Sequence, residues 1–257
     1  ILTPLLGSCT ADDVVGDAGR EGCDIISGQP MTVTSATRSA DGGKSSTQFE
    51  QDEIVWLWAN KPDGSKYINA WKLTAQSGGR LSGSLQYWPS DGSSLDVYAL
   101  HGNFKKSPSI SEGTTQWSNL SLTHTVETDQ SSDVNKRLSD LLYSQTSSAV
   151  APNNTVQLTF DHLLAKITVK LDLTNSKGID EGELANAEVT LTNIQPDATI
   201  SNESLTGNSE KTNTKGTHTT ITAGKITSSI TSGDVIGSAI VPLQQFGGVK
   251  NDASQNN

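Results

Sequence analysis

The chain has 257 residues, which is enough for one large domain or two modest domains with cores of their own. Its formal net charge of −10 argues against binding to nucleic acid, or to an anionic membrane surface, through charge alone. Hydrophobic residues make up only 33%, and Ser, Thr, Asn and Gly are abundant, which favours a β-rich protein with a large exposed surface.

The first nine residues combine an apolar segment with a cysteine. They end in Leu-Gly-Ser-Cys, which resembles a bacterial lipobox, because small residues before Cys9 let the chain lie extended in a peptidase cleft. We therefore predict that residues 1–9 are the remnant of a signal peptide with its lipobox, and that Cys9 carries the lipid. Residues 10–28 form a polar tether. The lipid would fix the protein to a membrane and would be its only membrane contact.

Apolar and polar residues alternate from Gln29 onward, with the period of two that is typical of β-strands. Turns rich in Pro, Asp and Gly, such as residues 61–64 and 89–92, divide this region at even spacing. The strands predicted in this first half cover residues 31–37, 53–60, 67–75, 81–88 and 94–101. Such a pattern is typical of a β-sandwich or a β-barrel.

A helix is predicted over residues 131–145, with Ser131 or Ser132 as its N-cap. Further strands are predicted at residues 155–160, 164–173, 187–194 and 235–243. The polar stretch 174–186 is the best candidate for a domain boundary. It separates an N-terminal domain of residues 29–175 from a C-terminal domain of residues 176–257.

No arrangement of residues points to catalysis, and we predict that the protein is not an enzyme. Spacings typical of zinc or cofactor sites are absent around the four histidines, His101, His124, His162 and His218, so no metal and no cofactor is expected. The Asp161-His162 pair lies between two alternating segments, where the alternation must slip, as at a bulge or a corner. We therefore interpret it as a structural pair that bonds to backbone groups left unpaired by the break.

The five tryptophans allow two interpretations. Aromatic faces stack on sugar rings, so tryptophans on neighbouring strands could form a platform for glycans. The alternative is a core packed with large rings, and it is favoured for Trp71 and Trp88. Trp56 and Trp58 are two positions apart and therefore share one face of their strand. Trp117 is left open between the two interpretations and is the candidate for ligand stacking.

Five segments, in a fixed order, resemble the fimbrillin family of Bacteroidales lipoproteins. They are "FEQDEIVWLWA", "YINAWKL", "LQYWPSDGSSLDVYAL", "SDLLYSQ" and "VQLTFDHLLAKITVKL". The last is the most specific, and together with the lipobox the resemblance covers residues 5–243. It implies an all-β fold of two transthyretin-like Greek-key β-sandwich domains in tandem. It also implies a surface pilus subunit that serves as shaft, anchor or tip.

The resemblance further implies assembly by strand exchange. In assembling members, an outer-membrane protease cuts after the first strand, that strand leaves, and a donor strand from another subunit fills the groove. Four or five apolar donor side chains would contribute about 6–15 kcal/mol. The removable strand in this sequence would be residues 31–37, whose alternating positions are Met31, Val33, Ser35 and Thr37.

Two arginines compete as the cleavage site. Arg38 follows the removable strand and begins a flexible Gly/Ser-rich segment, which suits a trypsin-like protease. Cleavage at Arg20, in the tether, would only free the protein from its lipid. A third alternative is that neither arginine is cut.

Family members usually continue for several strands beyond the segment that matches residues 235–246, whereas this chain ends in a polar tail. We expect either a fragment at both ends or an incomplete second domain. The expected partners are other pilus subunits, bound by strand exchange, and in addition host proteins or glycans. The alternative function is a non-polymerising surface lipoprotein that binds glycans or host proteins.

Overall fold

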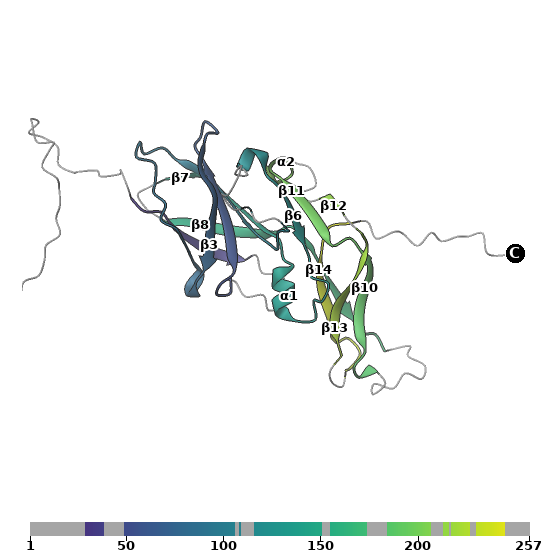
Figure 1. Ribbon diagram of the computed structural model, residues 1–257. Helices are drawn as coiled ribbons and strands as arrows, with labels where there is room; N and C mark the ends of the chain where they lie inside the picture. The colour runs from purple at the N-terminus through teal and green to yellow at the C-terminus, as the bar shows by residue number, and fades with distance from the viewer. Residues whose placement is uncertain are drawn as a thin grey trace, which may run out of the picture.

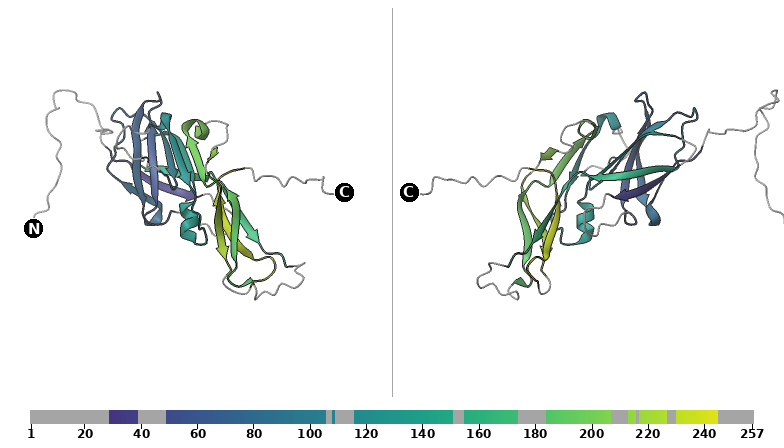
Figure 2. Two further views of the ribbon diagram at one scale, coloured as in Figure 1. Left: turned by 45° about the vertical axis from the view of Figure 1, so that its right-hand side comes forward. Right: turned by 180° about the vertical axis from the view of Figure 1, so that it is seen from behind.

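The computed structural model describes residues 29–38, 49–105, 108, 116–150, 155–173, 184–206, 213–215, 217–226 and 230–244. Strands account for most of the regular structure and the helices are short, so the expected all-β class is confirmed. The strands form two neighbouring lobes, as Figure 1 and Figure 2 show. The first lobe contains the earlier strands and is wide, whereas the second lobe is a narrow stack.

The first lobe is a closed barrel. Its strands are β1 Thr32–Arg38, β2 Ile54–Asn60, β3 Lys66–Ala75, β4 Arg80–Gly83, β5 Leu95–His101, β7 Leu142–Ala149 and β8 Thr155–His162. Around the barrel they follow the order β1-β4-β3-β2-β5-β7-β8, and β8 returns to β1. Neighbouring strands are antiparallel, except that β1 and β8 run parallel.

The second lobe is built from smaller sheets. Its strands are β6 Ser121–Thr125, β9 Ala165–Lys170, β10 Glu188–Ile194, β11 Asp197–Ser201, β12 Asn213–Lys215, β13 Thr219–Lys225 and β14 Val235–Val241. One sheet has the order β12-β11-β6, while β10 pairs with β13 and β14 pairs with β9. The helical elements are η1 Ser77–Gly79, η2 Trp117–Asn119, α1 Asp133–Leu138 and α2 Asn202–Thr206.

Strand β2 shows how the two lobes share their cores. Val55, Leu57 and Ala59 point into the barrel and belong to the core that fills it. This is the barrel core. The alternate residues Trp56 and Trp58 belong to a second core, the outer core, which lies between the outside of the barrel and the second lobe. A strand that is buried on both faces has a nearly continuous apolar sequence, and residues 54–59 of β2 show this pattern. All five tryptophans are buried, so the core assignment of Trp71 and Trp88 is confirmed.

Strand pairing crosses the expected domain boundary. Strands β6 and β9 precede residue 176, yet β6 pairs with β11 and β9 pairs with β14 in the second lobe. The division at residues 175 and 176 therefore stays a prediction as a domain boundary, and it does not coincide with the division between the two lobes.

The predicted helix over residues 131–145 is too long. Helix α1 covers only Asp133–Leu138, and its predicted cap is confirmed, because the Ser132 hydroxyl accepts a hydrogen bond from the Asn135 amide at 3.2 Å. Residues from Leu142 onward form β7 instead. Leu141 and Leu142 are fully buried in the outer core and the barrel core respectively. Burial on two opposite sides requires a strand, and this tertiary requirement overrides the local helical pattern.

The predicted strand over residues 81–88 is also too long, since β4 ends at Gly83. A Cβ atom at Gly83 would lie 2.5 Å from the Lys72 carbonyl oxygen and 2.6 Å from the Trp71 indole nitrogen, so only glycine fits there. The chain then leaves the sheet and returns at Tyr87, which forms an isolated antiparallel bridge with Pro30.

The buried side chain of Gln130 fastens the second lobe to the segment before α1. Its amide oxygen accepts a hydrogen bond from the Ile240 backbone amide at 2.7 Å, and its amide nitrogen donates to the Ile240 carbonyl at 2.9 Å. The side chain thus satisfies both backbone groups of Ile240 in the way a neighbouring strand would. Strand β14 is held to the connection between the lobes by this pair of bonds.

Candidate strand-exchange site

Strand β1 is paired along both of its sides. It runs parallel to β8, with register pairs from Thr32–Thr155 to Arg38–Phe160. On its other side it pairs with β4 only at Val33 and Thr34. Removal of β1 therefore breaks two ladders and opens the barrel, which is harder than removing a strand from the edge of a sheet.

The ladder between β1 and β8 is interrupted close to Arg38. Ser35 pairs with Leu158 and Thr37 pairs with Thr159, so one residue of β1 is left over as an irregularity of the bulge type. Such a position leaves one residue unpaired and disrupts the ladder locally. The last two residues of β1 are thus separated from the regular part of the strand.

The inward side of β1 contributes little to the barrel core. Met31 is 6% exposed and Val33 is 1% exposed, and burial of two such side chains stabilises by roughly 3–6 kcal/mol. The third buried position is Ser35, whose hydroxyl donates a hydrogen bond to the Gly79 carbonyl at 3.2 Å. The described inward positions of β1 and of Met31 just before it therefore hold two apolar side chains, fewer than the four or five expected of a donor strand.

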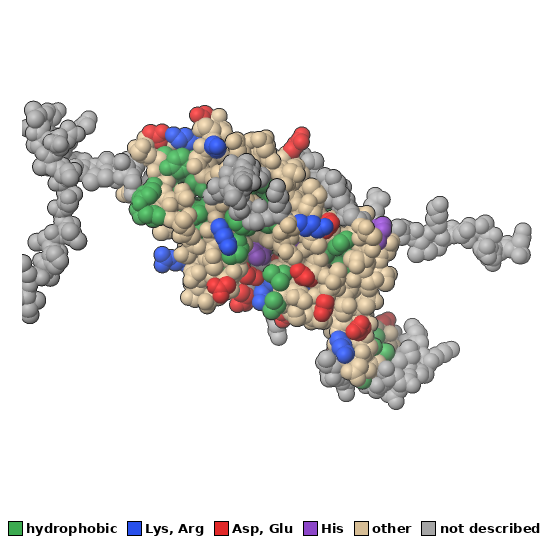
Figure 3. All heavy atoms as spheres, in the orientation of Figure 1, with side chains coloured by type: hydrophobic (Ala, Val, Ile, Leu, Met, Phe, Trp, Pro, Cys, Tyr) green, Lys and Arg blue, Asp and Glu red, His purple; other side chains and the backbone are tan. Residues whose placement is uncertain are grey.

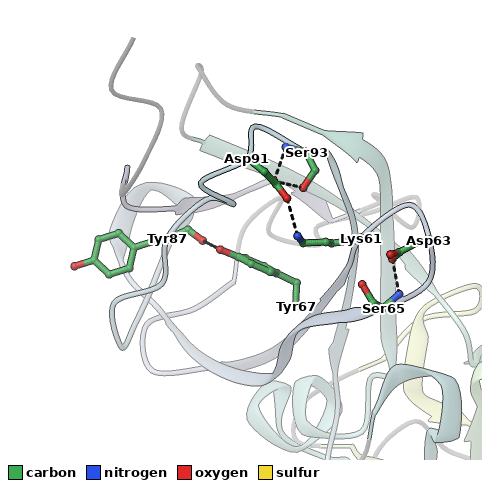
Figure 4. Close-up of polar contacts among 7 residues, drawn as sticks. All are labelled: Lys61, Asp63, Ser65, Tyr67, Tyr87, Asp91 and Ser93. Atoms are coloured by element: carbon green, nitrogen blue, oxygen red, sulfur yellow. Dashed lines mark hydrogen bonds and ion pairs between the residues drawn. The ribbon is translucent and has the colours of Figure 1, made fainter. Parts of the chain in front are cut away.

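The residues just before β1 bond to the segment that follows β4, so this segment extends the wall of the groove. The Met31 amide donates to the Gln86 carbonyl at 2.8 Å, and the Trp88 amide donates to the Gln29 carbonyl at 2.9 Å. The Tyr67 hydroxyl holds the same loop by donating to the Tyr87 carbonyl at 2.9 Å, as Figure 4 shows. The groove that β1 fills therefore has β8 as one wall, and β4 with residues 86–88 as the other.

A polar cluster fixes the turns at this end of the barrel (Figure 4). The Lys61 ammonium lies 2.9 Å from one carboxylate oxygen of Asp91, and the other accepts hydrogen bonds from the amide and hydroxyl of Ser93 at 3.0 and 2.6 Å. The Ser93 hydroxyl, together with Lys61, lowers the pKa of Asp91 well below its usual range. In the neighbouring turn, Asp63 accepts a hydrogen bond from the Ser65 amide at 2.8 Å. These contacts hold the turn at residues 61–65 against the turn at residues 89–93.

The structure describes only some of the predicted processing residues. Cys9 and Arg20 lie outside the described residues, so lipidation and cleavage in the tether stay predictions. Arg38 is the last residue of β1, and its backbone pairs with Phe160. A protease draws its substrate out in extended form, so cleavage after Arg38 requires the end of β1 to detach from β8 first.

Trp117 lies in the core between the lobes. Its side chain is 3% exposed, and its ring stacks on Tyr98 with centroids 4.3 Å apart and planes at 13°. Tyr143 lies parallel to it at 6.1 Å, and Trp58 lies at 5.5 Å. In this conformation the ring is covered by its neighbours and offers no open face to a sugar. Its role in ligand stacking stays a prediction.

The expected corner at Asp161-His162 is confirmed. Strand β8 ends at His162 in the barrel, and β9 begins at Ala165 in the second lobe. The Nδ1 atom of His162 lies 2.9 Å from a carboxylate oxygen of Asp140, which joins the corner to the turn after α1. His162 thus fastens the place where the chain passes from one lobe to the other.

Two wider features bear on the classes of function. Among the described residues, no group of three or more His, Cys, Asp or Glu side chains is arranged to hold a metal ion. Within the same residues, no helix is both long and apolar enough to cross a membrane.

Comparison with known sequences decides the family. The sequence model of the fimbrillin-like family matches residues 37–252. The chain belongs to the fimbrillin-like family. No curated protein matches the sequence.

Solved structures show the same fold. One is a candidate cell adhesion protein from Bacteroides ovatus, with a TM-score of 0.58 and 14% identity, covering 84% of this chain and 78% of that one. Another is a candidate cell adhesion protein from Bacteroides uniformis, with a TM-score of 0.56 and 19% identity, covering 84% and 75%. Membership of the fimbrillin-like family supports a role associated with fimbriae at the cell surface.

Sequence reasoning missed two parts of the groove. The wall formed by residues 86–88 was hidden inside a predicted continuous strand, although Gly83 in the middle of that strand is a signal of a break or a close approach. The pairing of β1 on both sides leaves no local signal, because it depends on β8, more than a hundred positions away, and on β4, more than forty positions away.

Proposed function

We propose that this fimbrillin is a structural subunit, or a tip or anchor adhesin, of a bacterial surface pilus. It would be exported as an outer-membrane lipoprotein through Cys9 and would consist of two transthyretin-like Greek-key domains. Assembly would proceed by protease-triggered donor-strand exchange with other subunits. The observation that carries the proposal is the position of Arg38, at the end of a strand that fills its groove with few apolar side chains.

The proposed exchange is favoured by the side chains that line the strand. A donor strand with an apolar residue opposite Leu158, where β1 has Ser35, would bury one more apolar side chain, worth about 1.5–3 kcal/mol. The ladder hydrogen bonds to β8 and β4 are broken and then formed again, so they nearly cancel.

Once β1 has left, the opened barrel strongly favours closure by another strand. A barrel that has lost β1 exposes the core side chains Leu81, Leu158 and Phe160, together with two unpaired strand edges. Such an opened barrel is strongly unfavourable in water, so any strand that can close it binds firmly. Cleavage after Arg38 would make the loss of β1 irreversible, because the strand is then no longer part of the folded chain.

Limited proteolysis tests the proposal. Low-dose trypsin should cut after Arg38, and the cut protein should form ladders that resist SDS. Arg38→Ala combined with Lys44→Ala should remain monomeric under the same treatment, because trypsin also cuts after Lys44 in the segment that follows β1, while Arg20→Ala, the matched control, should still form ladders. N-terminal sequencing of the product identifies the bond that was cut. Clean cleavage after Arg38 with no oligomer formed contradicts a shaft role, and resistance of that bond contradicts the proposed route.

The alternative function is a surface lipoprotein that binds glycans or host proteins without polymerising. The double-sided pairing of β1 favours it, because it makes the strand an integral part of the barrel. In that case trypsin would leave the bond after Arg38 intact at doses that remove the tether.

A further inference from the structure

An open cavity lies on the side of the barrel where β2 begins. Its volume is about 440 Å³, within the range of small-molecule sites. It is bounded by the segment before β2, by β3, by the connection from β5 to β6 and by α1. Figure 3 shows hydrophobic, acidic and basic side chains mixed on the surface around the position of α1. None of the residues that the strand-exchange proposal uses lines this cavity.

An ordered ion pair forms one wall of the cavity. One carboxylate oxygen of Glu53 accepts a hydrogen bond from the Glu50 amide at 2.9 Å, and the other lies 3.4 Å from Nε of Arg137. The Glu53 side chain is 11% exposed and the Arg137 side chain is 31% exposed. Glu53 is an ion-pair partner of Arg137 through Nε of the guanidinium. The two terminal nitrogens of a guanidinium held in this way can donate to a ligand.

Apolar groups form the rest of the lining. Ile54, Trp56 and Phe104 contribute from the barrel side and from the β5–β6 connection. Val134 and Leu138 lie four residues apart on α1, so they share one face of the helix, and they are 55% and 42% exposed. Exposed apolar side chains that rim a cavity, next to polar groups, are typical of a binding site.

The charges of the cavity nearly cancel. Its carboxylates are those of Glu50, Asp52 and Glu53, and its cations are Lys72 and Arg137. A strongly ionic ligand of either sign would meet like charges as well as opposite ones. Hydroxyl groups both donate and accept hydrogen bonds, so they match a mixture of carboxylates and cations. A sugar ring also offers an apolar face to side chains such as Trp56 and Leu138.

We propose that this cavity is a binding site for a short, neutral saccharide. Glu50 and Asp52 would accept hydrogen bonds from sugar hydroxyls, Arg137 and Lys72 would donate to ring and hydroxyl oxygens, and Val134 with Leu138 would cover the apolar face. The proposal rests on the adhesion role of the protein and is independent of strand exchange.

A glycan array of neutral, sialylated and uronic acid-containing saccharides, probed with the full chain, tests the proposal. Neutral saccharides should bind, and calorimetry with the best free saccharide should give its affinity. Val134→Ser with Leu138→Ser should weaken that affinity by about tenfold or more, because the lost apolar cover is worth at least 1.4 kcal/mol. The matched controls are Leu85→Ser and Val235→Ser, which change apolar residues of similar exposure (62% and 57%) outside the cavity.

A second variant tests the polar half of the site without disturbing the fold. Asp52 has a φ of 70°, a conformation that asparagine tolerates, so Asp52→Asn keeps the backbone and removes the charge. Together with Glu50→Gln it should also weaken neutral saccharide binding. Preference for sialylated glycans, binding of none of the saccharides, or an affinity unchanged in both cavity variants would each overturn the proposal. The trypsin ladder of the same variants reports separately on strand exchange.

Discussion

At the scale of single residues, His124 is the most constrained titratable group. It is fully buried, its Nδ1 accepts a hydrogen bond from the Asn103 amide at 2.9 Å, and its Nε2 donates to the Ser139 carbonyl at 2.9 Å. One ring nitrogen accepts and the other donates, which is the pattern of a neutral imidazole. Burial, and more weakly the neighbouring His101, lower the pKa of His124 to about 4. The ring joins the β5–β6 connection to the end of α1.

This geometry predicts a loss of stability in acid. Because the pKa of His124 is about 4 in the folded protein and 6.5 ordinarily, only the unfolded chain gains the proton between these values. The contribution of His124 to the free energy of unfolding is therefore fully present above pH 6.5, and it falls by roughly 3 kcal/mol as the pH drops to 4. Urea unfolding at a series of pH values measures this slope. His124→Gln should flatten it, and His218→Gln, at an exposed position, should not.

At the scale of elements, β1 is the strand whose replacement can be followed with one substitution. Val33→Ala removes buried apolar volume from β1 and should destabilise the uncut protein by about 2 kcal/mol. If β1 leaves during assembly, position 33 is absent from the finished polymer. The Val33→Ala polymer should then dissociate at the same temperature in SDS as the wild-type polymer.

Leu158 on β8 is the control for this prediction, since it lines the groove and stays in place. Leu158→Ala should lower the stability of the uncut monomer and also the dissociation temperature of the polymer. A Val33→Ala polymer that dissociates earlier than wild type would mean that β1 is retained and that oligomers form by another route.

At the scale of the whole molecule, the two lobes depend on one another. The outer core contains Trp58 and Tyr143 from the barrel together with Ile200 and Ile221 from the second lobe. Strands β6 and β9 pair with β11 and β14, which follow residue 176. The second lobe therefore takes two of its strands from before residue 176, whereas all seven strands of the barrel precede that residue.

A chain of residues 29–175 should accordingly fail to form a rigid domain. It leaves the outer face of the barrel uncovered, so we expect binding of the dye ANS, a weak near-UV circular dichroism signal and aggregation. The full chain under the same conditions is the reference. A sharp, cooperative unfolding transition of the fragment would instead support the boundary at residue 175 as a true domain boundary.

The sequence pattern was informative wherever local rules decide the structure. Alternation located β1, β2, β3 and β5 to within one residue at each end, and the turn at residues 61–64 was identified from its Pro-Asp-Gly residues. The pattern failed at residues 139–145 and 84–88. There, the two-sided burial of Leu141 and Leu142, and the bridge from Tyr87 to Pro30, come from distant parts of the chain.

The candidate sites likewise combine features that were visible in the sequence with features that only the fold brings together. The order of the apolar segments led to the fimbrillin family, and the position of Arg38 after a first strand was visible in the sequence. The sequence by itself thus determined the β class and the position of the first strand, because these follow from local period and composition, and the order of its segments indicated the family. Only the tertiary structure decided that β1 closes a barrel, that Trp117 is covered, and that Glu53, Arg137 and Leu138 meet around one cavity. Those facts depend on contacts between residues far apart in the chain, which no local pattern encodes.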